Sequence, residues 1–127
     1  MENKNYENSE NLELIKAAIQ AGQNAIRSII LINGGAAIAI IALLGHLAGA
    51  DSGVMHDYAQ CLLPFAAGTL LGGLMAGVTY LSQAAHAAGE GSKGTTINNI
   101  SIIIGLMSYA AFGLGVWWTY QAFSGAL

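Results

Sequence analysis

The sequence predicts an all-α membrane protein with three transmembrane helices preceded by an amphipathic N-terminal helix. The first observation is the position of its four basic and seven acidic residues, which leave three long uncharged stretches, 28–50, 58–85 and 94–127. Each stretch is long enough to cross a bilayer as a helix. The second is composition: 54% of the 127 residues are hydrophobic and 9% are charged, far less charge than in a soluble domain. Lipid is therefore the predicted surrounding of the fold.

Charge and cysteine content exclude several classes of function. The formal net charge is −3 and the basic residues are scattered, so the chain has neither a nucleic-acid footprint nor a polybasic cluster for anionic lipid. The single cysteine, Cys61, excludes an intramolecular disulfide and a cysteine-based zinc site. No cofactor is predicted.

The N-terminal region is expected to begin with a disordered polar tail over 1–11, because this segment has no apolar period. An amphipathic cytoplasmic helix is predicted over 12–27. Its apolar residues recur in steps of three and four, as in a coiled-coil seam, and form a candidate surface for oligomer contacts: Leu12, Ile15, Ile19, Ile26 and Ile29. Two arrangements fit. The helix either continues into the first span or lies in the headgroup plane and bends near Gly22 or 33–35.

The first span is predicted over about 28–48, and it carries the amide of Asn33. Lipid offers this amide no hydrogen-bond partner, so the protein has to supply one. Asn33 is expected to bond within its own bundle, to set the register between copies of the chain, or to contact a ligand at a locally opened turn. In the first two cases it is a helix-packing residue of the candidate site.

The second span, about 60–83, is predicted to be the packing hub of the domain 28–127. Pro64 falls near its start, where a missing backbone N–H costs least. Small residues form neighbouring rows that permit close approach of another helix: Gly68, Gly72 and Ala76 in one row, and Thr69, Gly73 and Gly77 in the other.

The third span is predicted over about 100–120, after a flexible connection over 87–99. It ends in aromatic residues that are expected to anchor the chain at the membrane interface, where rings with an apolar body and a polar edge collect. These predicted anchors are Trp117, Trp118 and Tyr120, with Tyr58 and Tyr80 at the two ends of the second span.

Basic residues predict the orientation. In a three-span chain, Lys4, Lys16, Arg27 and Lys93 all fall on one side of the membrane. The positive-inside rule places that side, with the N-terminus, in the cytoplasm and the C-terminus outside. The expected location is a bacterial inner membrane.

Titratable residues near the first loop form a possible metal or pH-sensing site. His46, Asp51, His56 and Asp57 lie within a dozen residues, and imidazole and carboxylate groups bind divalent metals. Their spacing matches no ligand motif, however, and a wet loop accommodates such residues at no cost. No hydroxyl or thiol has the His-plus-acid pattern of a nucleophile, and the spans lack the deep ionisable groups that ion-coupled transporters need.

The outline of the first half resembles the precursors of conjugative and type IV secretion pilins. Arg27, an apolar run over 28–45 and Ala48-Gly49-Ala50 before Asp51 are laid out like a signal peptide with a small-residue cleavage site. Cleavage near Ala50 would leave a hairpin of two helices. The acidic segment before the leader and the polar triplet 33–35 depart from the pilin pattern.

A second resemblance covers the whole chain. The patterns Arg27-Ser-Ile-Ile-Leu-Ile-Asn-Gly-Gly-Ala-Ala37, Thr79-Tyr-Leu-Ser-Gln83 and Trp118-Thr-Tyr-Gln-Ala-Phe123 are similar to those of a group of small uncharacterised bacterial inner-membrane proteins. This resemblance implies a membrane fold of three or four helices and no particular activity.

Three functional hypotheses follow. The favoured one is a non-enzymatic membrane protein that acts through helix packing, as a homo-oligomer or as a subunit bound to another membrane protein. The second is an oligomeric pore or holin-like permeabiliser, in which the hydroxyls of Thr69, Thr79, Ser101 and Ser108 face water. The third is a pilin-like subunit released by cleavage near Ala50.

Overall fold

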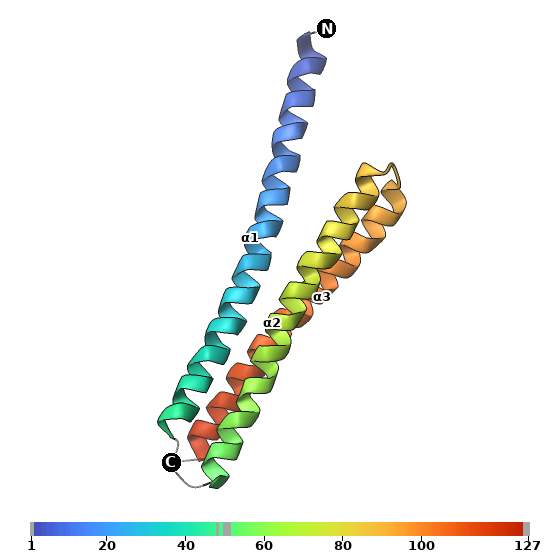
Figure 1. Ribbon diagram of the computed structural model, residues 1–127. Helices are drawn as coiled ribbons and strands as arrows, with labels where there is room; N and C mark the ends of the chain where they lie inside the picture. Colours follow the sequence, from blue (N-terminus) through green and yellow to red (C-terminus); the bar gives the residue numbers. More distant parts are fainter. Residues whose placement is uncertain (1, 48, 50–51, 126–127) are drawn as a thin grey trace.

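The computed structural model describes residues 2–47, 49 and 52–125, which form three helices: α1 (Glu2–His46), α2 (Ser52–Ala87) and α3 (Gly91–Gly125). α1 and α3 run in the same direction and α2 runs in the opposite one, so the two termini lie at opposite ends (Figure 1). Throughout the described part the regular structure is helical. Each helix holds a segment long and apolar enough to cross a membrane. These findings confirm the predicted all-α class with three potential spans.

α1 is one continuous helix of 45 residues, which is the first of the two arrangements expected, and an amphipathic helix over 12–27 as an element of its own is not supported. At about 1.5 Å per residue α1 extends for roughly 65 Å, about twice the thickness of a bilayer core. Gly22, Gly34 and Gly35 do not interrupt it. A glycine costs a helix only about 1 kcal/mol relative to alanine, whereas freeing the backbone groups at 33–35 in lipid costs several.

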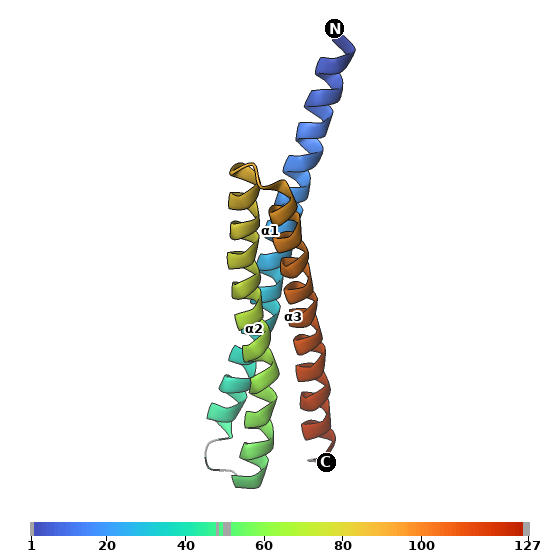
Figure 2. The ribbon, with the colours of Figure 1, turned by 90° about the vertical axis from the view of Figure 1, so that its right-hand side faces the viewer.

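The first residues of α1 also differ from the expectation. The chain is helical from Glu2, whereas the sequence predicts a disordered tail over 1–11. We call residues 4–22 the stalk, because every residue in this range is exposed. The N-terminal part of the stalk projects beyond the connection between α2 and α3 (Figure 2). No side of it is covered, so its apolar stripe has no partner within the described chain.

α2 and α3 form a tight hairpin, and the connection predicted over 87–99 is limited to residues 88–90. Gly89 has a φ of 81°, the left-handed conformation that commonly ends a helix. The N–H of Glu90 donates to the carbonyl of Ala85 across this turn at 3.0 Å. α3 then begins at once, and the hydroxyls of Thr95 and Thr96 donate to carbonyls one turn back within the helix.

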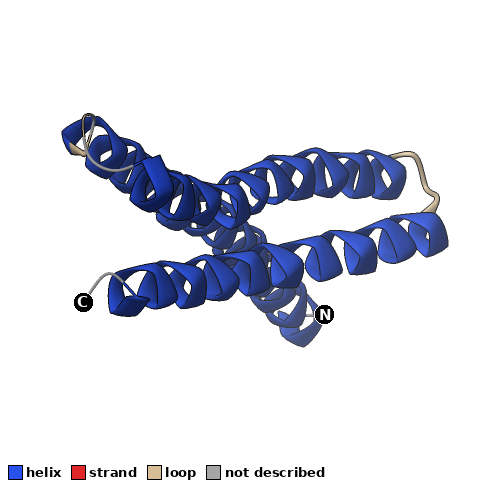
Figure 3. Ribbon diagram, turned by 90° about the horizontal axis from the view of Figure 1, so that it is seen from below, coloured by secondary structure: helices blue, strands red, loops and turns tan. Residues whose placement is uncertain are grey.

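α1 packs mainly against α2, and α2 packs more extensively against α3. The view in Figure 3 shows α1 crossing the α2–α3 pair at an angle. Pro64 lies buried inside α2, farther from the helix start than expected, because α2 begins at Ser52 and not near residue 60. A small apolar core of Ile40, Cys61 and Phe65 joins the helices near the 47–52 connection.

Candidate functional site

Glycines on α2 and α3 accept large side chains from the neighbouring helix. A Cβ atom at Gly72 would lie 2.8 Å from Ile29 Cγ2, one at Gly105 would lie 2.8 Å from Met75 Sδ, and one at Gly115 would lie 2.7 Å from the Phe65 ring. These separations are shorter than real Cβ contacts, so a larger residue would have to displace Ile29 or the Phe65 ring, or at Gly105 the flexible end of Met75. The helices therefore approach closely by placing a bulky residue over each glycine.

A polar junction of Asn33, Gly68 and Ser108 joins all three helices at the centre of the bundle. Asn33 and Ser108 are fully buried. Ser108 Oγ donates to the carbonyl of Gly68 at 2.7 Å and accepts a hydrogen bond from Asn33 Nδ2 at 3.3 Å. The same Nδ2 also donates to the carbonyl of Ile29 at 3.1 Å. Asn33 thus bonds inside its own chain, the first of the three arrangements expected for it, and the helix stays closed around it.

The oxygen of the same amide, Asn33 Oδ1, is buried without a conventional hydrogen-bond donor. It occupies the place that a Cβ of Gly68 would take. A glycine Cα–H group directed at a carbonyl oxygen is a weak hydrogen-bond donor, so Gly68 provides both the space and a partial partner. This contact explains why the junction needs glycine at position 68.

Further hydroxyls connect α2 to α3 between the junction and the hairpin turn. Ser101 Oγ donates to the carbonyl of Met75 at 3.2 Å and lies 2.6 Å from Thr79 Oγ1. The single hydroxyl hydrogen of Ser101 is already given to Met75, so Thr79 donates in the second contact. Ser82 Oγ donates to the carbonyl of Gly94 at 2.7 Å, and His86, whose ring covers Gly94, donates from Nδ1 to the carbonyl of Ser82 at 2.8 Å.

These bonds place the hydroxyls of the pore hypothesis inside the chain. Thr79, Ser101 and Ser108 bond across the α2–α3 interface, and Thr69 donates to the carbonyl of Phe65 at 3.0 Å. All four have a partner within the protein.

The two small-residue rows of the second span have different surroundings. Gly68 and Gly72 are buried against α1 and α3, and Ala76 is half-buried. Gly73 and Gly77 are exposed, with no atom within 4 Å of a Cβ built on either. The first row therefore packs within the described chain, whereas in the second row only Thr69, which is half-buried beside Gly34 of α1, does so.

The packing face of α3 was not predicted from the sequence. Its buried residues are Gly94, Ser101, Gly105, Ser108 and Gly115. Four of them, at 94, 101, 108 and 115, recur every seven residues, a coiled-coil spacing that could have revealed the face.

The apolar stripe of α1 divides into a free part and a covered part. Leu12, Ile15 and Ile19 are 57%, 56% and 45% exposed on the stalk. Farther along the same seam Ile26 is half-buried, and Ile29 is 1% exposed because it packs on Gly72. Ile29 is therefore an internal contact rather than a surface for a second chain.

The aromatic residues expected at the interface are exposed, with one exception. Tyr58 is 5% exposed, and its ring packs edge-on against Phe123 with centroids 5.1 Å apart. It therefore joins α2 to α3 rather than facing the surroundings. The remaining predicted anchors, Tyr80, Trp117, Trp118 and Tyr120, are exposed.

The predicted metal or pH-sensing residues do not converge in the described chain. His46 ends α1, and His56 Nε2 lies 2.9 Å from Gln60 Nε2. Across residues 2–47, 49 and 52–125, no group of three or more His, Cys, Asp or Glu side chains could hold a metal ion. Asp51 lies outside the described residues, as do Ala48 and Ala50 of the expected cleavage site.

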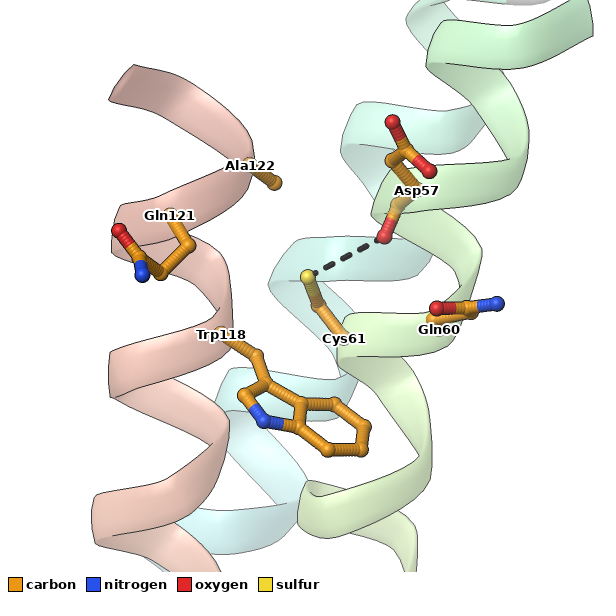
Figure 4. Close-up of a pocket in the computed structure, with 6 residues that line it drawn as sticks. All are labelled: Asp57, Gln60, Cys61, Trp118, Gln121 and Ala122. Atoms are coloured by element: carbon orange, nitrogen blue, oxygen red, sulfur yellow. Dashed lines mark hydrogen bonds between the residues drawn. The ribbon is translucent and has the colours of Figure 1, made fainter. Parts of the chain in front are cut away.

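A cleft of about 340 Å³ lies between α2 and α3 at the end opposite the hairpin turn, lined by Asp57, Gln60, Cys61, Trp118, Gln121 and Ala122 (Figure 4). Cys61 is 2% exposed, and its Sγ donates to the backbone carbonyl of Asp57 at 3.3 Å. The Asp57 carboxylate points away from this sulfur in Figure 4. No histidine is among the lining residues, so the cleft lacks the thiol–imidazole pair of an activated nucleophile. The buried thiol acts as a packing group.

Comparison of the chain with family models, curated proteins and solved structures gives no match.

Proposed function

We propose that this chain is a non-enzymatic integral membrane protein that self-associates through the stalk of α1. The observation that carries the proposal is the seam of Leu12, Ile15 and Ile19, which is exposed on the stalk and continues the line of residues that packs on α2 farther along α1. We assign the second copy as its occupant. A parallel copy brings an identical seam to the same height, because both chains are held in one membrane.

The free energy of this contact comes from the hydrophobic effect in water rather than from packing in lipid. The stalk lies outside the uncharged stretch that begins at residue 28. Burying a large aliphatic side chain is worth roughly 1.5–3 kcal/mol, and each copy contributes three half-exposed ones. Two protein chains anchored in one bilayer also meet at a high effective concentration. A short seam is therefore sufficient for association in the membrane.

We further propose that the stalk faces the cytoplasm of a bacterial cell and that the C-terminus lies outside. Support comes from Lys4 and Lys16 on the N-terminal half of α1, from Arg27 just past its midpoint and from Lys93 in the first turn of α3. The N-terminal half of α1 and the hairpin turn lie toward the same end of the bundle (Figure 1). This is the distribution of the positive-inside rule. The non-enzymatic part of the proposal rests on the buried hydroxyls and the thiol, whose hydrogens are given to structural partners.

Site-specific disulfide trapping in native membranes tests self-association. In a full-length C61S background, which keeps a donor for the Asp57 carbonyl, we expect Ile15→Cys to form a covalent dimer under mild oxidation. The matched control is Ala17→Cys, two residues away on the opposite side of the helix, with an expected yield about tenfold lower. Equal yields from the two positions, or no dimer from Ile15→Cys, would contradict the proposal. A monomeric stalk that binds a different protein would also contradict it.

A further inference from the structure

A second cleft of about 340 Å³ lies between α1 and α2 on the side of the hairpin turn. Farther along α1, Ile29 and Ile30 pack on Gly72, and from that contact α1 and α2 separate toward the hairpin (Figure 1). The cleft is lined by the apolar side chains of Ile26 and Ala76 and by polar residues from both helices: Gln23, Arg27, Thr79, Tyr80 and Gln83.

Arg27 has no counter-ion among the described residues, where the one recorded ion pair joins Lys93 to Glu90 at 2.9 Å. The nearest carboxylate before it on α1, Glu13, stands fourteen residues away, which is roughly 21 Å of helix. Asp57 lies near the other end of α2. The guanidinium also borders the uncharged stretch 28–50. A guanidinium at the edge of a membrane span gains from a charge-assisted hydrogen bond to an anionic partner, and the described residues do not provide one.

We propose that this cleft binds the head group of one anionic phospholipid. The lipid phosphate accepts hydrogen bonds from the Arg27 guanidinium, whose planar donors suit a phosphate bidentately, and from the side-chain amides of Gln23 and Gln83. One acyl chain lies along Ile26 and Ala76 and fills the space between the diverging helices, since an unfilled gap forfeits dispersion contacts.

Charge selects an anionic lipid over a zwitterionic one. The cleft presents one cation, and no carboxylate is among its lining residues, so the ammonium group of a zwitterionic lipid gains nothing there. The sequence has no polybasic cluster that would attract anionic lipid. In this site the single guanidinium of Arg27 attracts the lipid instead. The inference depends on the chain spanning a bilayer and not on stalk self-association.

Native mass spectrometry of the full-length protein in detergent tests the site, with phosphatidylglycerol, phosphatidylcholine and inorganic phosphate as separate ligands. The wild type is expected to bind one phosphatidylglycerol about tenfold more tightly than phosphatidylcholine, because both phosphates accept the same hydrogen bonds but the choline ammonium is repelled by Arg27. Arg27→Gln is expected to reduce this preference to within about twofold. Lys16→Gln removes the same charge from the stalk, outside the cleft, and should leave the preference unchanged.

A second variant separates a shaped site from general attraction. Ala76→Leu keeps Arg27 and fills the cleft, so phosphatidylglycerol binding should weaken about fivefold, while Arg27→Lys, which keeps the charge but not the bidentate donors, should give an intermediate preference. The proposal is overturned if Arg27→Gln keeps the preference, if Lys16→Gln lowers it equally, if Ala76→Leu binds as the wild type does, or if inorganic phosphate binds as tightly as the lipid.

Discussion

Replacing Gly68 by alanine directly perturbs the junction of the three helices. The new Cβ would coincide with the side-chain amide of Asn33, which is fully buried and too short to move aside. Overpacking of this kind costs about 1–3 kcal/mol. Displacing the amide also breaks its bond to Ser108, worth about 0.6 kcal/mol on average between membrane helices. Alanine returns about 1 kcal/mol of helix propensity, so we expect a net loss of about 0.6–2.6 kcal/mol.

The control is Gly73→Ala on the same helix, where a Cβ would meet open space. This change should be neutral or should stabilise the fold by up to about 1 kcal/mol. Reversible unfolding by a denaturing detergent, followed by circular dichroism, measures both variants. A double-mutant cycle isolates the contact: in an Asn33→Ala background the cost of Gly68→Ala should nearly vanish. Additive effects of the two changes, or a Gly68→Ala protein as stable as Gly73→Ala, would refute the reasoning.

Two further changes test the packing of α3 and its surface charge. Gly115→Ala places a methyl group against the Phe65 ring and should cost about 1–3 kcal/mol of unfolding free energy, whereas Gly113→Ala, which faces open space, should cost nothing; equal stability of the two proteins would count against the glycine contact. Lys93→Ala removes an ion pair to Glu90 whose side chains are 71% and 50% exposed, so the free energy of unfolding should change by less than about 0.5 kcal/mol, and a larger loss would show that the pair organises the hairpin turn.

The residues that the sequence places correctly are those whose environment depends on composition alone. The uncharged stretches after Arg27, after Asp57 and after Lys93 correspond to the three long apolar helices of the structure. The burial of Asn33 could be expected in the same way, since an amide in lipid has to find a partner inside the protein. Its partner, Ser108 on α3, could not be named, because that pairing depends on how two distant helices meet.

Positional details along the chain were harder to predict. Residues 2–11 are helical where a tail was expected, and α3 begins at Gly91 where a flexible connection was expected. Both segments are polar, and polar composition does not distinguish a solvated helix from a loop when hydroxyls such as those of Thr95 and Thr96 can bond back to the helix itself.

Which segments of this protein are apolar enough to enter a membrane follows from the amino-acid sequence, because transfer into lipid depends on each residue separately. Which face of each helix is internal depends on how the three helices pack. Gly68 and Gly72 are covered while Gly73 and Gly77 are open, and Tyr58 is buried while Tyr80 is exposed. In water, hydrophobic side chains mark the inner face of a helix, but in lipid the outer face is equally apolar. The inner face is then defined by shape and hydrogen bonding between helices, which appear only once the helices are packed.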